Sequence, residues 1–500
     1  MALTLIARPQ DVTPAYNPIK WIVDSNIKNY DGFRYVFKIK DSLSNIIAEY
    51  RVLPTYGTGY GEQDLSKLLS NYVSFDLNTD STTFYPATNS SYIYKIETGE
   101  EYTSQVNYTS TLVNSSGNVR INVTNTFVAG DRINIKQVDG GAANPYMEGL
   151  FTVLSATGSY LVINSQWSLV TNAAIDGTII YADNRKTYVA GTEYTKKVFN
   201  GALRWLDFPT WEYDDFNLIA NTKRWFTNQP TTFYSTLGQD IYLNAGNPSG
   251  NPEYVIFKNS NGEYFYKTIS GTTPLIHQIP IGANNYGVLI PIGAATLPMI
   301  KTDTTYYEVY YSSANTGTPI QNSLKYRINL DTRVQISEYH CLFLDRMGSF
   351  SSFAFQLKNY ERGEVTRDEY NKDVTGFINT TPTVDQWSYG TIENGFKSFN
   401  INVKKTIDLN TNWMTEEMNR YFEELITSPQ VYLKLASYTN TENWLYPEDE
   451  SGCPLRIPES TEYQPVIVQN NQYEIFQQRN KNLIKHSITV RLANQDNING

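Results

Sequence analysis

The three histidines and two cysteines carry the chemistry that is easiest to recognise. His277, His340 and His486 lie far apart in the sequence, and Cys341 directly follows His340. We expect this adjacent pair to lie in a strand, where neighbouring side chains point to opposite faces of the sheet. A shared metal ion or a Cys–His catalytic pair is therefore not expected there. A disulfide between Cys341 and Cys453 is possible, and the sequence leaves it open.

Acidic pairs are the second candidate, because two carboxylates flanking a sugar suffice for glycoside hydrolysis. Asp214 and Asp215 are the one suggestive pair, since they lie among aromatic residues that can bind sugar. Such aromatics more often form a core edge or an interface, and we favour that reading. The aromatic run comprises Trp205, Phe208, Trp211, Tyr213 and Phe216. The other acidic groups are Glu416–Glu417 and Glu423–Glu424, expected on a solvated helix face, and Glu448–Asp449–Glu450.

Two short motifs begin like ligand-binding loops but fail on spacing. TYGTGYG places Gly57, Gly59 and Gly61 before a predicted helix, where amides attract phosphate. Its spacing is GxGxG rather than GxGxxG, so we predict a flexible turn or subunit-contact loop. Residues 76–80, DLNTD, open like a calcium loop, but Ser81 and Ala87 replace the required Gly and Glu. We predict a turn before a strand.

Motifs and charge together exclude several classes of function. The sequence has no GxSxG, HExxH or CxxC motif, so we predict a non-enzymatic protein without catalytic, cofactor-binding or metal-binding residues. With 40 basic and 50 acidic residues the net charge is −10, which argues against a duplex nucleic-acid binder and against docking on anionic membranes. The first residues, MALTLIARPQDVTP, contain no long apolar run, so we expect neither a signal peptide nor a membrane span.

The composition favours strands. Charged residues make up only 18% of the 500 residues, against about 25% in an average globular protein. Thr, Ser, Asn and Gly take their place, and the 39 tyrosines suit half-buried pleated surfaces, with many partly exposed at subunit contacts. We predict an all-β protein of several β-sandwich or barrel-like domains, with an inserted small β-barrel and one prominent amphipathic helix near the C-terminus.

Local patterns set the expected domain boundaries. Phe33, Tyr35, Phe37 and Ile39 alternate with mostly polar residues, which is typical of a half-buried strand. Five short strands between 106 and 182 indicate the inserted barrel, and residues 259–262, NSNG, indicate a hairpin turn. The expected domains are residues 1–105 with 183–223, the barrel 106–182, a middle domain 224–337, and a C-terminal domain 338–500 containing a helix over 415–428.

Three segments carry a resemblance to a known family. They are RWFTNQP (224–230) after the block starting at Asn200, YHCLFLDRMGSFSSFAFQL (339–357), and the C-terminal sequence from VKKTIDLNTNWMTEEMNRYFEELITSPQVYLKL to LIKHSITVRLA. Together they resemble structural tail or neck-ring proteins of tailed phages infecting Bacteroidetes, including crAss-like phages. The resemblance covers most of the chain outside the inserted barrel and brings no catalytic residues.

The resemblance implies a virion component of the tail or neck, made in the host cytoplasm and repeated around the tail axis. Its partners would be copies of itself and neighbouring virion proteins, and DNA would pass a central channel without specific binding. Two other functions stay open from the residues: a host-receptor or glycan-binding tail protein, supported by aromatic and Asn/Asp loops, and a capsular glycan hydrolase, which lacks a decisive motif.

Overall fold

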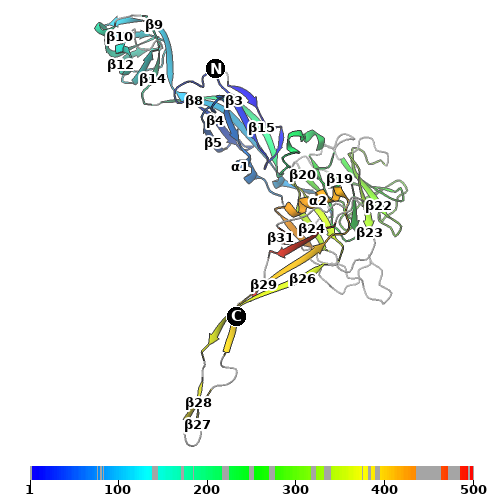
Figure 1. The fold of residues 1–500 in the computed structure, drawn as a ribbon. Helices are drawn as coiled ribbons and strands as arrows, with labels where there is room; N and C mark the ends of the chain where they lie inside the picture. The colour runs from blue at the N-terminus through cyan, green and yellow to red at the C-terminus, as the bar shows by residue number, and fades with distance from the viewer. Residues whose placement is uncertain are drawn as a thin grey trace. The chain divides into compact units, whose positions relative to one another are not determined.

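In the computed structural model the chain folds mainly into β-strands, which confirms the all-β prediction (Figure 1). It forms two compact units, the first made of Met1–Thr13, Pro18–Leu69 and Ile93–Val198 and the second of Pro14–Asn17, Ser70–Tyr92 and Phe199–Gly500. The structure describes residues 3–75, 77–78, 82, 84–137, 145–170, 174–183, 185–216, 224–246, 253–269, 276–316, 323–331, 339–357, 359–373, 376–380, 385–388, 395–434, 463–470, 485–493 and 496–498.

The first unit is built on a five-stranded sheet in the order β2-β15-β8-β4-β5 and a three-stranded sheet in the order β1-β3-β6. Tyr35, Phe37 and Ile39 of β4 are fully buried, as their alternation predicts. A helix α1 (Ser66–Leu69) follows β6. The strands are β1 (Thr4–Ala7), β2 (Val12–Pro14), β3 (Lys20–Asp24), β4 (Arg34–Lys40), β5 (Ile46–Val52), β6 (Gly61–Asp64), β8 (Ser91–Thr103) and β15 (Lys186–Phe199).

The inserted barrel lies in the connection between β8 and β15, which are neighbours in the five-stranded sheet. It closes in the order β10-β13-β12-β11-β14-β9 around a core that includes Val119, Ile133 and Ile163. It has six strands rather than five, because the polar, Thr- and Ser-rich β9 also pairs. The strands are β9 (Gln105–Ser115), β10 (Asn118–Asn122), β11 (Arg132–Gln137), β12 (Gly149–Thr157), β13 (Tyr160–Gln166) and β14 (Ala174–Tyr181).

The second unit begins with a sandwich of two sheets. The six-stranded sheet runs β16-β23-β22-β18-β19-β21 and the three-stranded sheet β17-β20-β7. Leu243 and Ile279 of the small sheet share one core with Phe257 and Val309 of the large sheet. The strands are β7 (Tyr85–Pro86), β16 (Thr232–Thr236), β17 (Tyr242–Gly246), β18 (Glu253–Asn259), β19 (Tyr264–Ile269), β20 (Ile276–Pro280), β21 (Ile290–Ile292), β22 (Tyr306–Ser312) and β23 (Tyr326–Asp331).

The chain leaves the first unit for the last time after Val198. The sequence predicted that the N-terminal domain would extend to residue 223. Phe199 packs on Trp211 and Phe226, with ring centroids 5.5 and 4.9 Å apart. The Asn17 side chain donates to Leu203 O at 3.0 Å and accepts from Leu203 N at 2.8 Å. These contacts join residues after β15 to the second unit, and an alternation pattern cannot reveal them.

The C-terminal part of the second unit is a sheet in the order β25-β24-β30-β31-β32-β29-β26, with α2 (Glu416–Thr427) packed on it (Figure 1). As predicted, Thr415 caps the helix, since its hydroxyl accepts from Met418 N at 3.3 Å. No helix in the described ranges is long and apolar enough to cross a membrane. The strands are β24 (Tyr339–Leu344), β25 (Phe350–Phe355), β26 (Tyr360–Lys372), β27 (Phe377–Thr380), β28 (Asp385–Ser388), β29 (Gly395–Asn410), β30 (Val431–Lys434), β31 (Tyr463–Val468), β32 (Ser487–Leu492) and β33 (Asp496–Ile498).

The turn between β24 and β25 requires glycine at residue 348. Gly348 has φ +75°, and a Cβ there would overlap the carbonyl oxygen of Asn200. We expect Gly348→Ala to destabilise the second unit by more than about 3 kcal/mol, because backbone must move in addition to the left-handed strain. Gly262→Ala is the matched control, since Gly262 has φ +80° and open space around its Cβ position. Similar urea midpoints for the two variants would contradict this account.

A buried ion pair ties the sandwich to the C-terminal sheet. Asp240, between β16 and β17, accepts from Lys434 Nζ of β30 at 3.0 Å, from Tyr463 OH of β31 at 2.6 Å and from Asn284 Nδ2 at 2.8 Å. The side chains of Asp240 and Lys434 are only 7% and 4% exposed. Burial alone would raise the pKa of Asp240, but Lys434 and the two other donors hold it below its usual value.

Removing one partner of this pair leaves a buried charge uncompensated. We expect Asp240→Ala to lower the free energy of unfolding by about 3–5 kcal/mol, and the double variant Asp240→Leu/Lys434→Met to recover most of that loss. Glu364→Ala, at the exposed ion pair with Lys404, is the control and should cost less than about 1 kcal/mol. Urea denaturation measures all three, and an Asp240→Ala midpoint equal to that of the control would refute the role of the pair.

Candidate functional site

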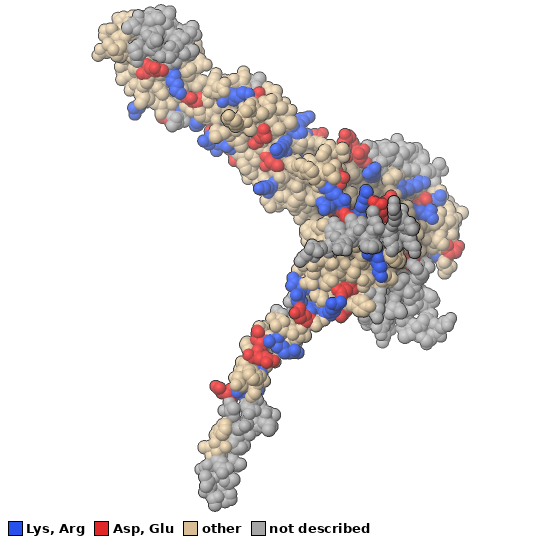
Figure 2. Space-filling model, viewed as in Figure 1, with Lys and Arg blue, Asp and Glu red and all other residues tan. Residues whose placement is uncertain are grey.

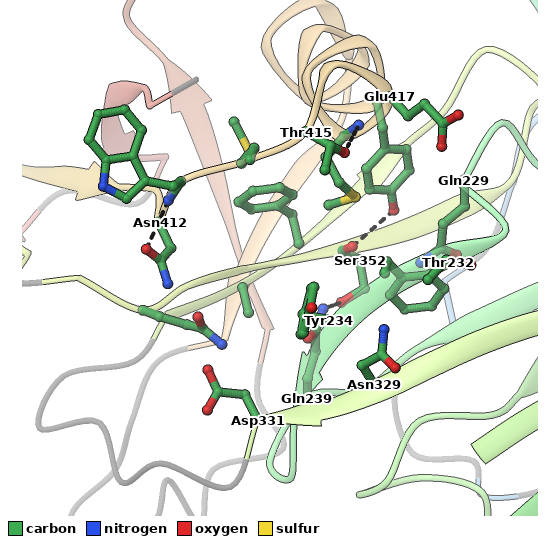
Figure 3. A pocket seen from close by; sticks show the side chains of 18 of the residues that line it. Gln229, Thr232, Tyr234, Gln239, Asn329, Asp331, Ser352, Asn412, Thr415 and Glu417 are labelled. Carbon is green, nitrogen blue, oxygen red and sulfur yellow. Dashed lines mark hydrogen bonds between the residues drawn. The ribbon is translucent and has the colours of Figure 1, made fainter. Parts of the chain in front are cut away.

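A pocket of about 1000 Å³ opens inside the second unit between the sandwich and the C-terminal sheet (Figure 3). One wall comes from β16 and the end of β23, and the opposite wall from β25 and the start of α2. Figure 3 shows Thr415 and Glu417 on the helix side, and Tyr234, Asn329 and Asp331 on the sandwich side. Segments more than 180 residues apart in the sequence thus face one space, which sequence reasoning did not predict.

The inner wall of the pocket carries two buried glutamines. Gln229 and Gln239 are 4% and 2% exposed. Gln239 Nε2 donates to Ser352 Oγ at 2.9 Å, which fixes the orientation of its amide. Within the described part of the chain, neither Gln229 Oε1 nor Gln239 Oε1 has a hydrogen-bond partner. A buried acceptor without a donor costs about 1–3 kcal/mol. Both oxygens have almost no exposed surface, so they lie behind the pocket wall and not at its surface.

The rim of the pocket is aromatic and acidic. Tyr234 and Trp413 are 71% and 59% exposed and line the opening. Asp331, Glu416 and Glu417 also line it, and no Lys or Arg does so among the residues described. The pocket therefore disfavours anions and suits a neutral or cationic ligand that brings hydrogen-bond donors.

A pair of buried carboxyl groups lies outside this pocket. Asp345, at the end of β24, accepts from Ser349 N at 3.0 Å and from the hydroxyls of Ser349 and Ser351, both at 2.8 Å. Glu424 of α2 accepts from Asn228 Nδ2 at 3.1 Å and from Arg346 N at 3.2 Å. The sequence placed Glu424 on a solvated face, and this was wrong: it is 5% exposed, because the helix turns it toward the β24–β25 turn. Glu416 and Glu417 are exposed as expected.

The two carboxyl groups disfavour each other's ionisation. Burial, with Glu424 nearby, raises the pKa of Asp345 to about 7. Burial also raises the pKa of Glu424, although Arg346 N, Asn228, and the charges of Arg204 and Arg346 oppose this. Through the hydrogen bond from Arg346 N to Glu424, the pair joins the β24–β25 turn to α2. Neither carboxyl group lines the pocket, so the geometry supports a structural role.

This pair predicts a specific pH dependence. A carboxyl group whose pKa is higher in the folded state binds more protons when folded, so its contribution to stability falls as pH rises from 3.8 toward about 7. We expect Asp345→Asn to flatten that fall, with the variant gaining a few kcal/mol relative to the native chain between pH 5 and pH 8. Urea midpoints at both pH values measure the change, with the exposed Glu417→Gln as control. Parallel pH profiles for Asp345→Asn and the native chain would contradict it.

The three histidines lie apart, each buried. His277 stacks on Phe84, His340 in β24 is 3.2 Å from Thr236 Oγ1, and His486 Nε2 is 2.6 Å from Asn419 Oδ1. Burial lowers the pKa of His486. Among the described residues no group of His, Cys, Asp or Glu could hold a metal ion.

Cys341 lies in the core beneath α2, and burial raises the pKa of its thiol, so it is not an activated nucleophile. Cys453 lies outside the described residues, as do Glu448–Asp449–Glu450, Asp76 and residues 79–81 of the calcium-like motif.

The remaining motifs do not form sites in the described ranges. A strand, β6, separates the TYGTGYG loop from the four-residue helix α1, so the loop amides do not continue into a helix start. Gly57 and Gly59 have φ +89° and +71°, and Gly59 O accepts from Tyr35 OH at 2.8 Å. Hydrogen bonds from Thr55 N to Tyr60 O and from Gly59 N to Thr55 O, both 2.8 Å, close this turn.

The aromatic run beside Asp214 and Asp215 forms a core edge. Trp211 stacks on Phe216 with ring centroids 6.1 Å apart and both are buried, whereas Asp214 and Asp215 are exposed. Burial raises the pKa of Tyr213 to about 12. Neither aspartate lines the pocket, so the structure gives them no converging partner there.

A second candidate site is the hairpin that we call the arm, residues 360–410, which contains β26, β29 and the strands β27 and β28. Strands β26 and β29 pair from Tyr360–Asp408 to Lys372–Gly395. Strand β32 pairs with β29 only at 406–410 and β33 only at 401–403. Beyond those contacts the two strands of the arm pair only with each other in the described part of the chain.

The arm is exposed on both faces except at its base, where Ile407 and Leu409 are buried. Every side chain of β26 is exposed except Lys372, which is half-buried. Val365, Tyr370, Phe396 and Phe399 are between 42% and 75% exposed. Figure 2 shows basic and acidic side chains interspersed along the arm. One ion pair there joins Arg362 and Asp408 at 2.6 Å. Strand β26 is also the last strand of its sheet, so its outer edge is open in the described structure.

Comparisons with known proteins leave the function open. No family model matches the chain, and no curated protein matches it. Among solved structures, the adhesin domain of Epf from Streptococcus pyogenes is 8% identical with a TM-score of 0.13, and the comparison covers 61% of this chain and 93% of that one. Escherichia coli alpha-2-macroglobulin activated by porcine elastase is 9% identical with a TM-score of 0.13, covering 81% of this chain and 42% of that one. Likeness at this level carries no argument about fold or function.

Proposed function

We propose that the chain is a non-enzymatic structural subunit of a phage virion, and that it assembles as a ring in the tail or neck through contacts between copies. The observation that carries the proposal is the arm. A two-stranded hairpin without a hydrophobic core is marginally stable in water, and this one runs for about 40 Å. A neighbouring copy that covers its apolar side chains would supply the missing burial.

Apolar side chains lie on both faces of the arm, with Val365 and Phe396 on one face and Tyr370 and Phe399 on the other. Phe396 pairs with Asn371, which lies six residues from Val365 on β26, so Val365 and Phe396 share a face of the arm. Phe399 and Tyr370 contact each other at 5.7 Å. An arm reaching from one copy to the next makes a heterologous contact, which closes into a ring when the rotation permits.

The virion assignment rests on the resemblance of the three segments quoted above. The tyrosines support subunit contacts less than the composition suggested, because several are fully buried in the core. These include Tyr35, Tyr94, Tyr307 and Tyr421. The net charge of −10 fits a channel through which DNA passes without binding, since like charges repel. Self and neighbouring virion proteins are the proposed partners.

Substitutions on the arm test the assembly. We expect the full chain to form multimers by light scattering and rings by negative-stain microscopy. The double variant Val365→Ser/Phe396→Ser should shift the mass to that of a 57.0 kDa monomer, because it removes apolar area from one face of the arm. Its circular dichroism should stay unchanged, since both side chains lie outside the core.

The matched control is Leu206→Ser/Val288→Ser, two side chains of the second unit that are 85% and 84% exposed. It should leave the multimer intact. A native chain that stays monomeric at all concentrations would refute ring assembly, and an arm variant with the native mass would show that the arm does not carry it.

A further inference from the structure

The arm has two open edges that differ in charge. Strand β26 is the last strand of its sheet, and no described strand pairs with its outer edge. The outer edge of β29 is covered by β32 at 406–410 and by β33 at 401–403, which leaves 395–400 open in the described structure. Strand β26 holds four acidic and three basic residues, whereas β29 holds three basic residues and one acidic residue. The charges of the two edges are therefore complementary.

An open edge of this kind is recognised by another strand. Its row of backbone N–H and C=O groups forms hydrogen bonds with any extended chain that lies alongside. A lone two-stranded hairpin is marginally stable in water, and further strands extend it into a stable sheet. When arms point the same way around a ring axis, β26 of one copy lies beside β29 of the next. These two strands then run antiparallel, as they do within one arm.

The side chains select one register for this pairing. Placing Val365 opposite Phe396 of a second copy keeps the faces matched, because Phe396 pairs with Asn371 in its own arm and Asn371 shares a face with Val365. One residue earlier on β26, the same register puts Glu364 opposite Lys397 of the second copy. All four side chains are exposed. One apolar pair and one pair of opposite charges thus form side by side, and each stabilises an antiparallel ladder.

We propose that the outer edge of β26 at 362–366 pairs antiparallel with the outer edge of β29 at 395–399 of a second copy, with Val365 opposite Phe396 and Glu364 opposite Lys397. This inference rests on the proposed arm-mediated assembly and names the element that the arm binds. The contact is heterologous, so it passes from copy to copy and can close into a ring. The rival partner is β26 of a second copy, which makes a twofold contact and stops at two chains.

Cysteine crosslinking of the full-length protein tests the partner and the register together. The register also places Gly363 opposite Ser398 of the second copy, on the same face. Cβ atoms of directly opposite residues lie about 4.5–5.5 Å apart, close enough for a disulfide after small adjustments. Open space surrounds the Cβ position of Gly363, so a cysteine fits there. The variant Gly363→Cys/Ser398→Cys, in a Cys453→Ser background, should give a ladder of two and more chains on a non-reducing gel after mild oxidation.

The ladder can come only from contacts between copies. Ser398 pairs with Glu369 in its own arm, six residues from Gly363 and therefore about 20 Å along the strand, too far for a disulfide within one chain. The matched control is Thr366→Cys/Ser398→Cys, because Thr366 is exposed on the opposite face of the arm. It should give no ladder.

Reversing the charge at the contact gives a second measurement. Lys397→Glu places two acids opposite each other and should weaken self-association about threefold or more by light scattering at low salt. Adding Glu364→Lys restores opposite charges between copies and should recover most of the loss, although the new lysine also approaches Lys404 of its own arm. A double variant that associates no better than Lys397→Glu alone would count against the register.

Each crosslinking result decides between the alternatives. A ladder that stops at two chains would assign the edge to β26 of a second copy, and equal ladders from the test and control variants would show that the pairing has no register. Either result overturns the proposal. No crosslink in a native-sized multimer would refute this partner and leave the proposed assembly standing, whereas a native chain that stays monomeric would refute both.

Discussion

The charge of Asp240 can be buried only because Lys434 lies against it, and the second unit is organised around this constraint. Tyr463 and Asn284 complete the donors to the same carboxylate. Just before it in the chain, Gln239 donates to Ser352 of β25. A short segment between β16 and β17 is thus bound to three strands of the C-terminal sheet. The directional bonds fix how the sandwich and that sheet meet, which hydrophobic packing alone leaves less defined.

The pocket is a consequence of that fixed junction. Its walls belong to the sandwich and to the C-terminal sheet, and the hydrogen bond from Tyr421 OH to Ser352 O at 2.9 Å joins α2 to β25. Unpaired glutamine oxygens persist in its wall because the surrounding network determines their place.

The arm, in contrast to this buried junction, is largely exposed. Beyond Ile407 and Leu409, which belong to the core of the C-terminal sheet, its described strands are held by backbone hydrogen bonds and cross-strand pairs, such as Val365 opposite Val403. Such a structure gains stability chiefly from whatever covers it. The same chain therefore combines a body that buries hydrogen-bonded charges, such as Asp240 with Lys434, with a largely exposed hairpin. Our proposal of ring assembly rests on this exposed hairpin.

The sequence by itself determined the classes of element. Alternation in β4, the turn at Gly262 and the cap at Thr415 depend on residues within a few positions of each other, and each formed as predicted. The sixth barrel strand was missed because β9 is too polar to show a clear period.

Only the tertiary structure decided which distant residues meet. Glu424 was assigned to solvent because its helix neighbours are charged, and it is buried because the β24–β25 turn, whose Arg346 lies 78 residues earlier, packs over it. Asp240 with Lys434, and Gln239 with Ser352, join segments more than 100 residues apart. Local periodicity records which way a side chain points relative to its own element. It does not record which other element lies there. The pocket forms where two such distant elements, the sandwich and the C-terminal sheet, face each other.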